Sequence, residues 1–224
     1  MPGRLMEGPL SDPAATLRGM TRIALFHSVL GIRQGIIDAA EVFRSAGHEV
    51  LVVDQYGGRS FDDYAEAGEF AAGLGFPQAL MRSALAAIAD DPGPLVAAGF
   101  SNGAGMAEYV TAVRGGRAGG VVGSLQFAGA LPLAMLGVDV WPVDTPVQLH
   151  YAADDPMRSD EWITAFTESV RASGAKCDAY LDYPGGHLFT DAARPEEYDA
   201  HSTAEAFGRA LEFLDRLDRE LGER

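Results

Sequence analysis

Ser101 lies in the segment Gly99-Phe100-Ser101-Asn102-Gly103, which has the pattern G-x-S-x-G. Where this pattern joins a strand to a helix, the tight turn strains the serine backbone and exposes its hydroxyl for nucleophilic attack. The flanking glycines are needed because a Cβ at either position would collide with the neighbouring element. The backbone amide of Asn102, at the start of the expected helix, can stabilise an oxyanion.

A serine hydroxyl needs a histidine base that is oriented by a carboxylate. His187 follows the last expected strand, and Asp154 and Asp155 follow the strand before it. The chain order Ser, Asp, His is the order found in α/β-hydrolase folds. The pattern therefore predicts a nucleophile, Ser101, and a base, His187, and leaves two candidates for the acid.

These residues need a scaffold, and the apolar runs of the chain alternate between strand and helix patterns. Expected strands cover 21–27, 49–53, 95–99, 121–127, 146–151 and 175–181, and expected helices cover 36–46, 79–89, 103–113, 161–173 and 196–217. Uniformly apolar strands that alternate with helices indicate a mostly parallel sheet with helices on both faces. Ligands bind such sheets at the carboxyl ends of the strands, where all the candidate residues fall.

The length of 224 residues fits a single domain. The first nineteen residues contain Pro2, Pro9 and Pro13 and no apolar run typical of a signal peptide. We therefore expect residues 1–19 to form a flexible N-terminal tail, residues 20–224 to form the domain, and Met20 to be an alternative start.

The amino-acid composition indicates which kinds of partner and location to expect. A hydrophobic fraction of 47% and a net charge of −15 indicate a soluble globular protein that would repel nucleic acid and anionic membrane surfaces. No run of about 18 apolar residues predicts a membrane helix. Cys177 is the one cysteine, so an intramolecular disulfide is impossible and a cytoplasmic location is expected. Monomer and dimer both remain open.

Neither a metal nor another cofactor is expected, because no His, Asp or Glu cluster has metal-ligand spacing and no dinucleotide-binding glycine motif occurs. His27 and His48 flank buried strands, where histidines more often make structural hydrogen bonds, although His27 could line the pocket. Cys177 is expected to be a small buried residue of a strand.

The chain also resembles the dienelactone hydrolase family of the α/β-hydrolase fold, from about Thr21 to Leu217. The resemblance depends on segments at the ends of the expected strands: Leu25-Phe26-His27-Ser28 with Gly31, Ala46-Gly47-His48, Asp54-Gln55-Tyr56-Gly57-Gly58, the Ser101 segment, His150-Tyr151-Ala152-Ala153-Asp154, and Tyr183-Pro184-Gly185-Gly186-His187-Leu188-Phe189. It implies a triad of Ser101, Asp154 and His187, with Asp155 as the alternative acid. It also implies an oxyanion hole formed by the amides of Asn102 and Val29.

Two departures limit what the resemblance implies. Founding members have a cysteine at the position of Ser101 and a glutamate near the position of Ser28. The lactone substrate of those members therefore does not carry over. We predict a serine hydrolase that cleaves a small ester, thioester or lactone through an acyl-enzyme. The alternatives are a non-catalytic binding protein with the same fold and, more remotely, a flavodoxin-like nucleotide-binding protein, for which the sequence lacks a phosphate loop.

Overall fold

A computed structural model describes residues 21–90, 93–116 and 120–223. The expected tail, residues 1–19, lies outside the described residues. The strands are β1 (Arg22–Phe26), β2 (Glu49–Val53), β3 (Leu95–Phe100), β4 (Val121–Phe127), β5 (Val147–Ala152) and β6 (Cys177–Tyr183). The helices are α1 (Gln34–Ser45), α2 (Tyr64–Gly73), α3 (Gln78–Ala87), α4 (Asn102–Arg114), α5 (Asp160–Ala172) and α6 (Ala200–Gly222), with a short 3₁₀ helix η2 (Leu133–Leu136).

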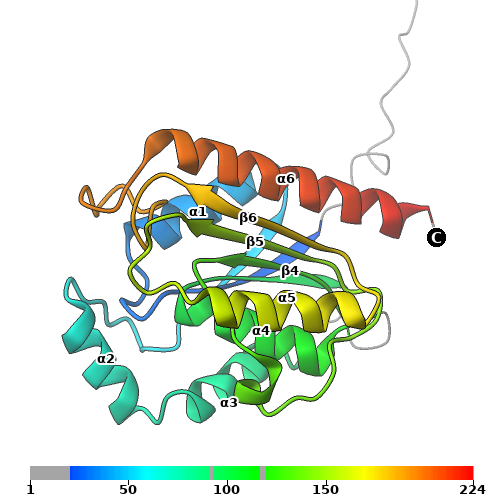
Figure 1. The fold of residues 1–224 in the computed structure, drawn as a ribbon, viewed down its shortest axis with the longest axis horizontal. Helices are drawn as coiled ribbons and strands as arrows, with labels where there is room; N and C mark the ends of the chain where they lie inside the picture. Colours follow the sequence, from blue (N-terminus) through cyan, green and yellow to red (C-terminus); the bar gives the residue numbers. More distant parts are fainter. Residues whose placement is uncertain (1–20, 91–92, 117–119, 224) are drawn as a thin grey trace, which may run out of the picture.

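The six strands form one sheet in the order β2-β1-β3-β4-β5-β6, and every neighbouring pair is parallel. Helices α1 and α6 cover one face, and α3, α4 and α5 cover the other (Figure 1). This arrangement confirms the predicted α/β-hydrolase fold with helices on both faces of a parallel sheet. Because all strands run the same way, their carboxyl ends meet at one edge of the sheet.

The core consists of two apolar layers, one on each face of the sheet. Phe43 of α1 and Phe213 of α6 belong to one layer, and Val110 of α4 and Phe166 of α5 belong to the other. Strand β3, at the centre, is buried along its whole length. The central strands therefore form a rigid base for the loops that follow them.

The predicted strands and helices are confirmed with small shifts of their ends, but two elements were not predicted. Helix α2 begins after Asp63, whose carboxylate accepts hydrogen bonds from the amides of Ala65 and Glu66. Only Ala67 and Ala71 of this helix are buried, so its apolar periodicity is weak. Helix η2 is a single turn and leaves no periodic pattern.

Candidate active site

The turn at Ser101 has the strained backbone that the sequence pattern predicts. Ser101 joins β3 to α4 with φ 55° and ψ −120°, a backbone conformation that residues other than glycine rarely adopt. Its amide donates a hydrogen bond of 2.8 Å to the carbonyl of Phe127 on the neighbouring strand β4. The surrounding sheet thus holds the strained turn in place.

The glycines on either side of Ser101 allow helix α4 to approach the sheet closely. A Cβ at Gly99 would lie 2.0 Å from the Gly103 carbonyl oxygen, and a Cβ at Gly103 would lie 2.3 Å from the His27 carbonyl oxygen. Any side chain at these positions would therefore push α4 away from β1 and β3. The start of α4 and the end of β1 are consequently neighbours in space.

Ser101, His187 and Asp155 form a continuous hydrogen-bonded chain. His187 Nε2 lies 2.7 Å from Ser101 Oγ, and His187 Nδ1 lies 2.8 Å from Asp155 Oδ2. Ser101 follows β3, His187 follows β6 and Asp155 follows β5, and both the imidazole and the carboxylate are buried. The arrangement can remove a proton from the serine hydroxyl and hold the resulting imidazolium beside a carboxylate.

Of the two candidates for the acid, the structure places Asp155 against His187, and not Asp154, which the resemblance implies. Asp154 is exposed, whereas the side chain of Asp155 is fully buried against His187. Consecutive side chains in the turn after β5 point in different directions, so only one can face the imidazole. Asp155 Oδ1 also accepts a hydrogen bond of 2.8 Å from the Met157 amide, which fixes the carboxylate in this orientation.

Glu197 holds the loop that carries His187. The amide of Gly186 donates to the Glu197 carbonyl at 2.7 Å, and the amide of Leu188 donates to the Glu197 carboxylate at 2.6 Å. Tyr64 donates its hydroxyl proton to the same carboxylate, and burial together with this carboxylate raises the tyrosine pKa. Arg194 completes the network with an ion pair of 2.6 Å to Glu197. Glu197 therefore holds the chain on both sides of His187.

Val29 and Asn102, the expected oxyanion donors, come from adjoining segments. Val29 is half-buried in the turn after β1, and Asn102 is the first residue of α4. An amide at the first position of a helix has no acceptor within that helix, so the Asn102 N–H is free to bind an anion. The catalytic use of both amides stays a prediction.

His27 contributes hydrogen bonds to the turn that contains Val29. Its Nδ1 lies 2.7 Å from the Ser28 carbonyl oxygen, to which it donates, and its Nε2 accepts from the Gln55 amide at 3.2 Å. This pattern requires a neutral ring, and burial lowers the His27 pKa accordingly. Of the two possibilities for His27, these contacts favour the structural one.

A cavity opens beside Ser101 and His187, with a volume of about 590 Å³ that includes its open side. Its floor consists of the start of α4 and of residues 128–131, which follow β4. Its outer wall includes the exposed side chains of Phe76, Met157 and Trp162. The Ser101 hydroxyl is thus accessible to a small molecule from a mostly apolar space.

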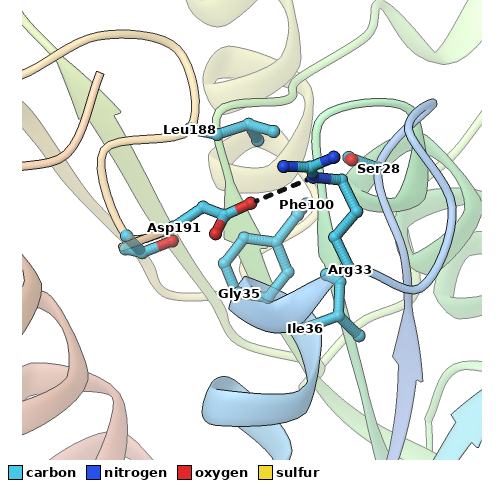
Figure 2. Close-up of a pocket in the computed structure, with 8 residues that line it drawn as sticks. Ser28, Arg33, Gly35, Ile36, Phe100, Leu188 and Asp191 are labelled. Carbon is cyan, nitrogen blue, oxygen red and sulfur yellow. Dashed lines mark ion pairs between the residues drawn. The ribbon is translucent and has the colours of Figure 1, made fainter. Parts of the chain in front are cut away.

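A second and smaller hollow lies on the other side of the His187 loop. Figure 2 shows Arg33 reaching over it toward Asp191, with Ser28 and Leu188 at its edge. Arg33 Nε lies 3.6 Å from Asp191 Oδ2, and its Nη1 donates to the Phe61 carbonyl at 2.8 Å. The guanidinium therefore connects the segment after β1 to the segment after His187.

The remaining candidates are outside the site. Cys177 is half-buried at the start of β6, and burial raises its thiol pKa to about 11. No cluster of three or more His, Cys, Asp or Glu side chains suited to a metal occurs in the part of the chain that the structure describes. Within the same residues, no helix has the length and apolar character that crossing a membrane requires.

The parallel sheet, the strained serine turn and the hydrogen-bonded chain of Ser101, His187 and Asp155 define an α/β-hydrolase. Residues 7–217 match the model of the dienelactone hydrolase family. The chain belongs to the dienelactone hydrolase family, and it is a hydrolase that acts on ester bonds.

Solved structures of similar fold agree with this assignment. One is the dienelactone hydrolase-like promiscuous phosphotriesterase P91 from metagenomic libraries, with a TM-score of 0.73, 22% identity and coverage of 89% of this chain and 87% of that one. Another is Thermogutta terrifontis esterase 2 phosphorylated by paraoxon, with a TM-score of 0.60, 17% identity and coverage of 90% and 84%. At these identities the likeness shows the fold alone. No curated protein matches the chain.

Sequence reasoning missed Glu197 and the outer wall of the cavity. Glu197 lies in a short acidic segment before α6, where no motif distinguishes it from a solvated carboxylate. Trp162 gave a weak signal, because it is a large apolar residue on the first turn of a helix, directly after two acidic residues. Residues around Phe76 had no assigned element, so nothing placed them near Ser101.

Proposed function

We propose that this protein is a serine hydrolase that cleaves a small ester, thioester or lactone through an acyl-enzyme. The observation that carries the proposal is the pair of short hydrogen bonds, 2.7 Å from Ser101 Oγ to His187 Nε2 and 2.8 Å from His187 Nδ1 to Asp155 Oδ2. Ser101 is the nucleophile, His187 the base, and Asp155 the acid that orients it.

In the first half-reaction, His187 Nε2 accepts the hydroxyl proton as Ser101 Oγ bonds to the carbonyl carbon of the substrate. The carbonyl oxygen becomes an oxyanion, which accepts hydrogen bonds from the amides of Asn102 and Val29. The tetrahedral intermediate collapses, the bond to the leaving oxygen or sulfur breaks, and His187 returns the proton to that atom. An acyl-enzyme on Ser101 remains.

In the second half-reaction, a water molecule repeats the attack on the acyl carbon. His187 takes a proton from the water, the oxyanion forms at the same two amides, and Ser101 Oγ leaves with the proton that His187 returns. Asp155 stays ionised throughout and stabilises the imidazolium. The Ser101 turn supports this scheme because its backbone directs the hydroxyl away from the sheet.

The test is covalent labelling of Ser101 combined with turnover. A fluorophosphonate should label one serine per chain, and the Ser101→Ala variant should lose both labelling and hydrolysis of 4-nitrophenyl acetate. Ser202→Ala is a matched control, since Ser202 is a buried serine of α6 that lies outside the triad and outside the cavity lining. Full hydrolysis by the Ser101→Ala variant would refute the proposal and favour the alternative of a non-catalytic binding protein.

The proposal also includes a cellular location, a class of partner and the absence of a cofactor. A reducing cytoplasm suits a chain with Cys177 as its one cysteine, and the charge of −15 disfavours nucleic acid as a partner. The proposed reaction takes all its groups from the protein and water, and so it uses no cofactor.

A further inference from the structure

The cavity beside Ser101 has an outer wall of apolar side chains that are exposed to solvent. Phe76 is 41% exposed, Met157 49% and Trp162 39%. They come from three segments: the connection from α2 to α3, the connection from β5 to α5, and the first turn of α5. Large apolar side chains that converge on a cavity mark a surface that a ligand covers.

The inner wall is apolar as well. Met106 of α4 and Leu131 of the segment after β4 line it beside Ala128, Gly129 and Ala130. Gly129 lies against the serine turn so closely that a Cβ there would be 2.4 Å from the Ser101 carbonyl oxygen. A hydrocarbon group bound in this cavity would therefore contact mainly carbon atoms, close to Ser101.

Positive charge is absent from this space. Among the described residues that line the cavity, the polar ones are Ser101, Asn102, Tyr151 and His187, and none is a lysine or arginine. The buried carboxylate of Asp155 lies directly behind His187, so the local charge is negative. A carboxylate on the substrate would lose its hydration here without a cation to replace it.

Two arginines in segments that follow strands of the sheet, Arg158 and Arg33, are engaged elsewhere. Arg158 donates its Nη1 to the Leu181 carbonyl at 2.5 Å and its Nε to Asp160 at 2.7 Å. Arg33, in the hollow of Figure 2, pairs with both Asp62 and Asp191. Neither guanidinium can turn to an anionic substrate without giving up a carboxylate partner.

We propose that the site selects uncharged esters that carry an apolar chain, and that it discriminates against esters that carry a carboxylate. The apolar chain contacts the apolar lining of the cavity, which includes Met106, Leu131, Met157 and Trp162. This inference rests on the proposed function, because it names the substrate class of the same serine site.

The test compares two esters with the same leaving group. The mono-4-nitrophenyl ester of adipic acid ends in a carboxylate, and 4-nitrophenyl 6-methylheptanoate carries an isopropyl group of similar shape at that position. After subtraction of the non-enzymatic rate, we expect kcat/KM to be at least 20-fold lower for the carboxylate. In a 4-nitrophenyl series, kcat/KM should also rise from acetate to hexanoate.

A charge-reversal experiment locates the effect. Met157→Arg places a cation at the mouth of the cavity and should raise kcat/KM for the carboxylate ester relative to the neutral ester at least fivefold. Met135→Arg is the matched control, because Met135 is 51% exposed and lies outside the cavity lining. Trp162→Lys repeats the test from α5 should the first variant be unstable.

The outcomes separate this inference from the proposed function. Equal kcat/KM for the two esters, with Ser101 labelled by a fluorophosphonate, overturns the selectivity and leaves the serine hydrolase intact. Labelling without turnover of either ester also overturns the substrate class. If the fluorophosphonate does not label Ser101 and the protein hydrolyses no ester, the proposed function itself is refuted. Equal responses of the Met157 and Met135 variants would show that the cavity does not bind the chain.

Discussion

Replacing Asp155 with asparagine should reduce kcat by a factor of about 10⁴, whereas Asp154→Asn should change it less than twofold. Asp155 accepts two hydrogen bonds, one from His187 through Oδ2 and one from the Met157 amide through Oδ1. An asparagine has one oxygen, so it can satisfy only one of these donors. One orientation of the amide group gives His187 the wrong tautomer, and the other leaves two N–H donors facing each other.

If the asparagine NH₂ faces His187, the imidazole must present an unprotonated Nδ1 and carry its proton on Nε2. That tautomer cannot accept the Ser101 proton, and the same change in a serine protease triad lowers kcat about 10⁴-fold. If the amide is reversed, its NH₂ opposes the Met157 N–H in a buried place, which costs about 1–3 kcal/mol. A loss of 10⁴ corresponds to about 5.5 kcal/mol of transition-state stabilisation.

The assay is steady-state hydrolysis of 4-nitrophenyl acetate by both variants, with thermal unfolding followed by circular dichroism. Asp154 is exposed, so its variant should also keep the parent melting temperature. A variant at Asp154 that loses a thousandfold, beside an active variant at Asp155, would refute the assignment of the acid. Full activity of both would refute a role for any carboxylate in orienting His187.

Two further changes test the surroundings of the site. Glu197→Gln should lower kcat and the rate of fluorophosphonate labelling about tenfold, because one amide oxygen cannot serve both the Leu188 N–H and Arg194; Glu196→Gln is the exposed control. Glu108→Gln tests a fully buried carboxyl whose pKa burial raises well above its usual value. Because the folded parent then binds more protons than the unfolded chain, its stability should fall relative to the variant as the pH rises from 5 to 8, measured as melting temperatures.

Each of these expectations has a contrary result. Unchanged labelling by the Glu197 variant would show that the His187 loop keeps its position without that carboxylate. A difference in melting temperature between parent and Glu108 variant that stays constant from pH 5 to pH 8 would show that Glu108 has the same proton affinity in the folded and unfolded chains.

The sequence predicted the structure where neighbouring residues alone determine the local conformation. Strands 49–53 and 121–127 were predicted with their observed bounds, because each is a short segment rich in β-branched and apolar residues between glycine-containing turns. The turn at Ser101 could be predicted because its glycines meet a local steric need. Side-chain direction in the turn after β5 could not, because it depends on contacts with the segment that carries His187.

The cavity walls were also beyond prediction, for a related reason. The cavity brings together Phe76, Met157 and Trp162, which come from three segments far apart in the sequence. No local sequence pattern predicts that such segments lie close together. Glu197 is similar, because its contacts to the His187 loop depend on the path of the chain before α6. Spacing along the chain predicts which strand end a residue follows, but not which neighbour it finds there.

The position of β6 at the edge of the sheet has a consequence for how activity and folding are linked. Ser101 follows the central strand β3, but His187 follows a strand that has a single neighbour, β5. Edge elements open at lower free energy than central ones. A molecule can therefore keep its nucleophile and most of its secondary structure while its base has separated from it. Catalysis thus depends on the local stability of the β6 edge and α6, so inactivation on heating can precede loss of the fold.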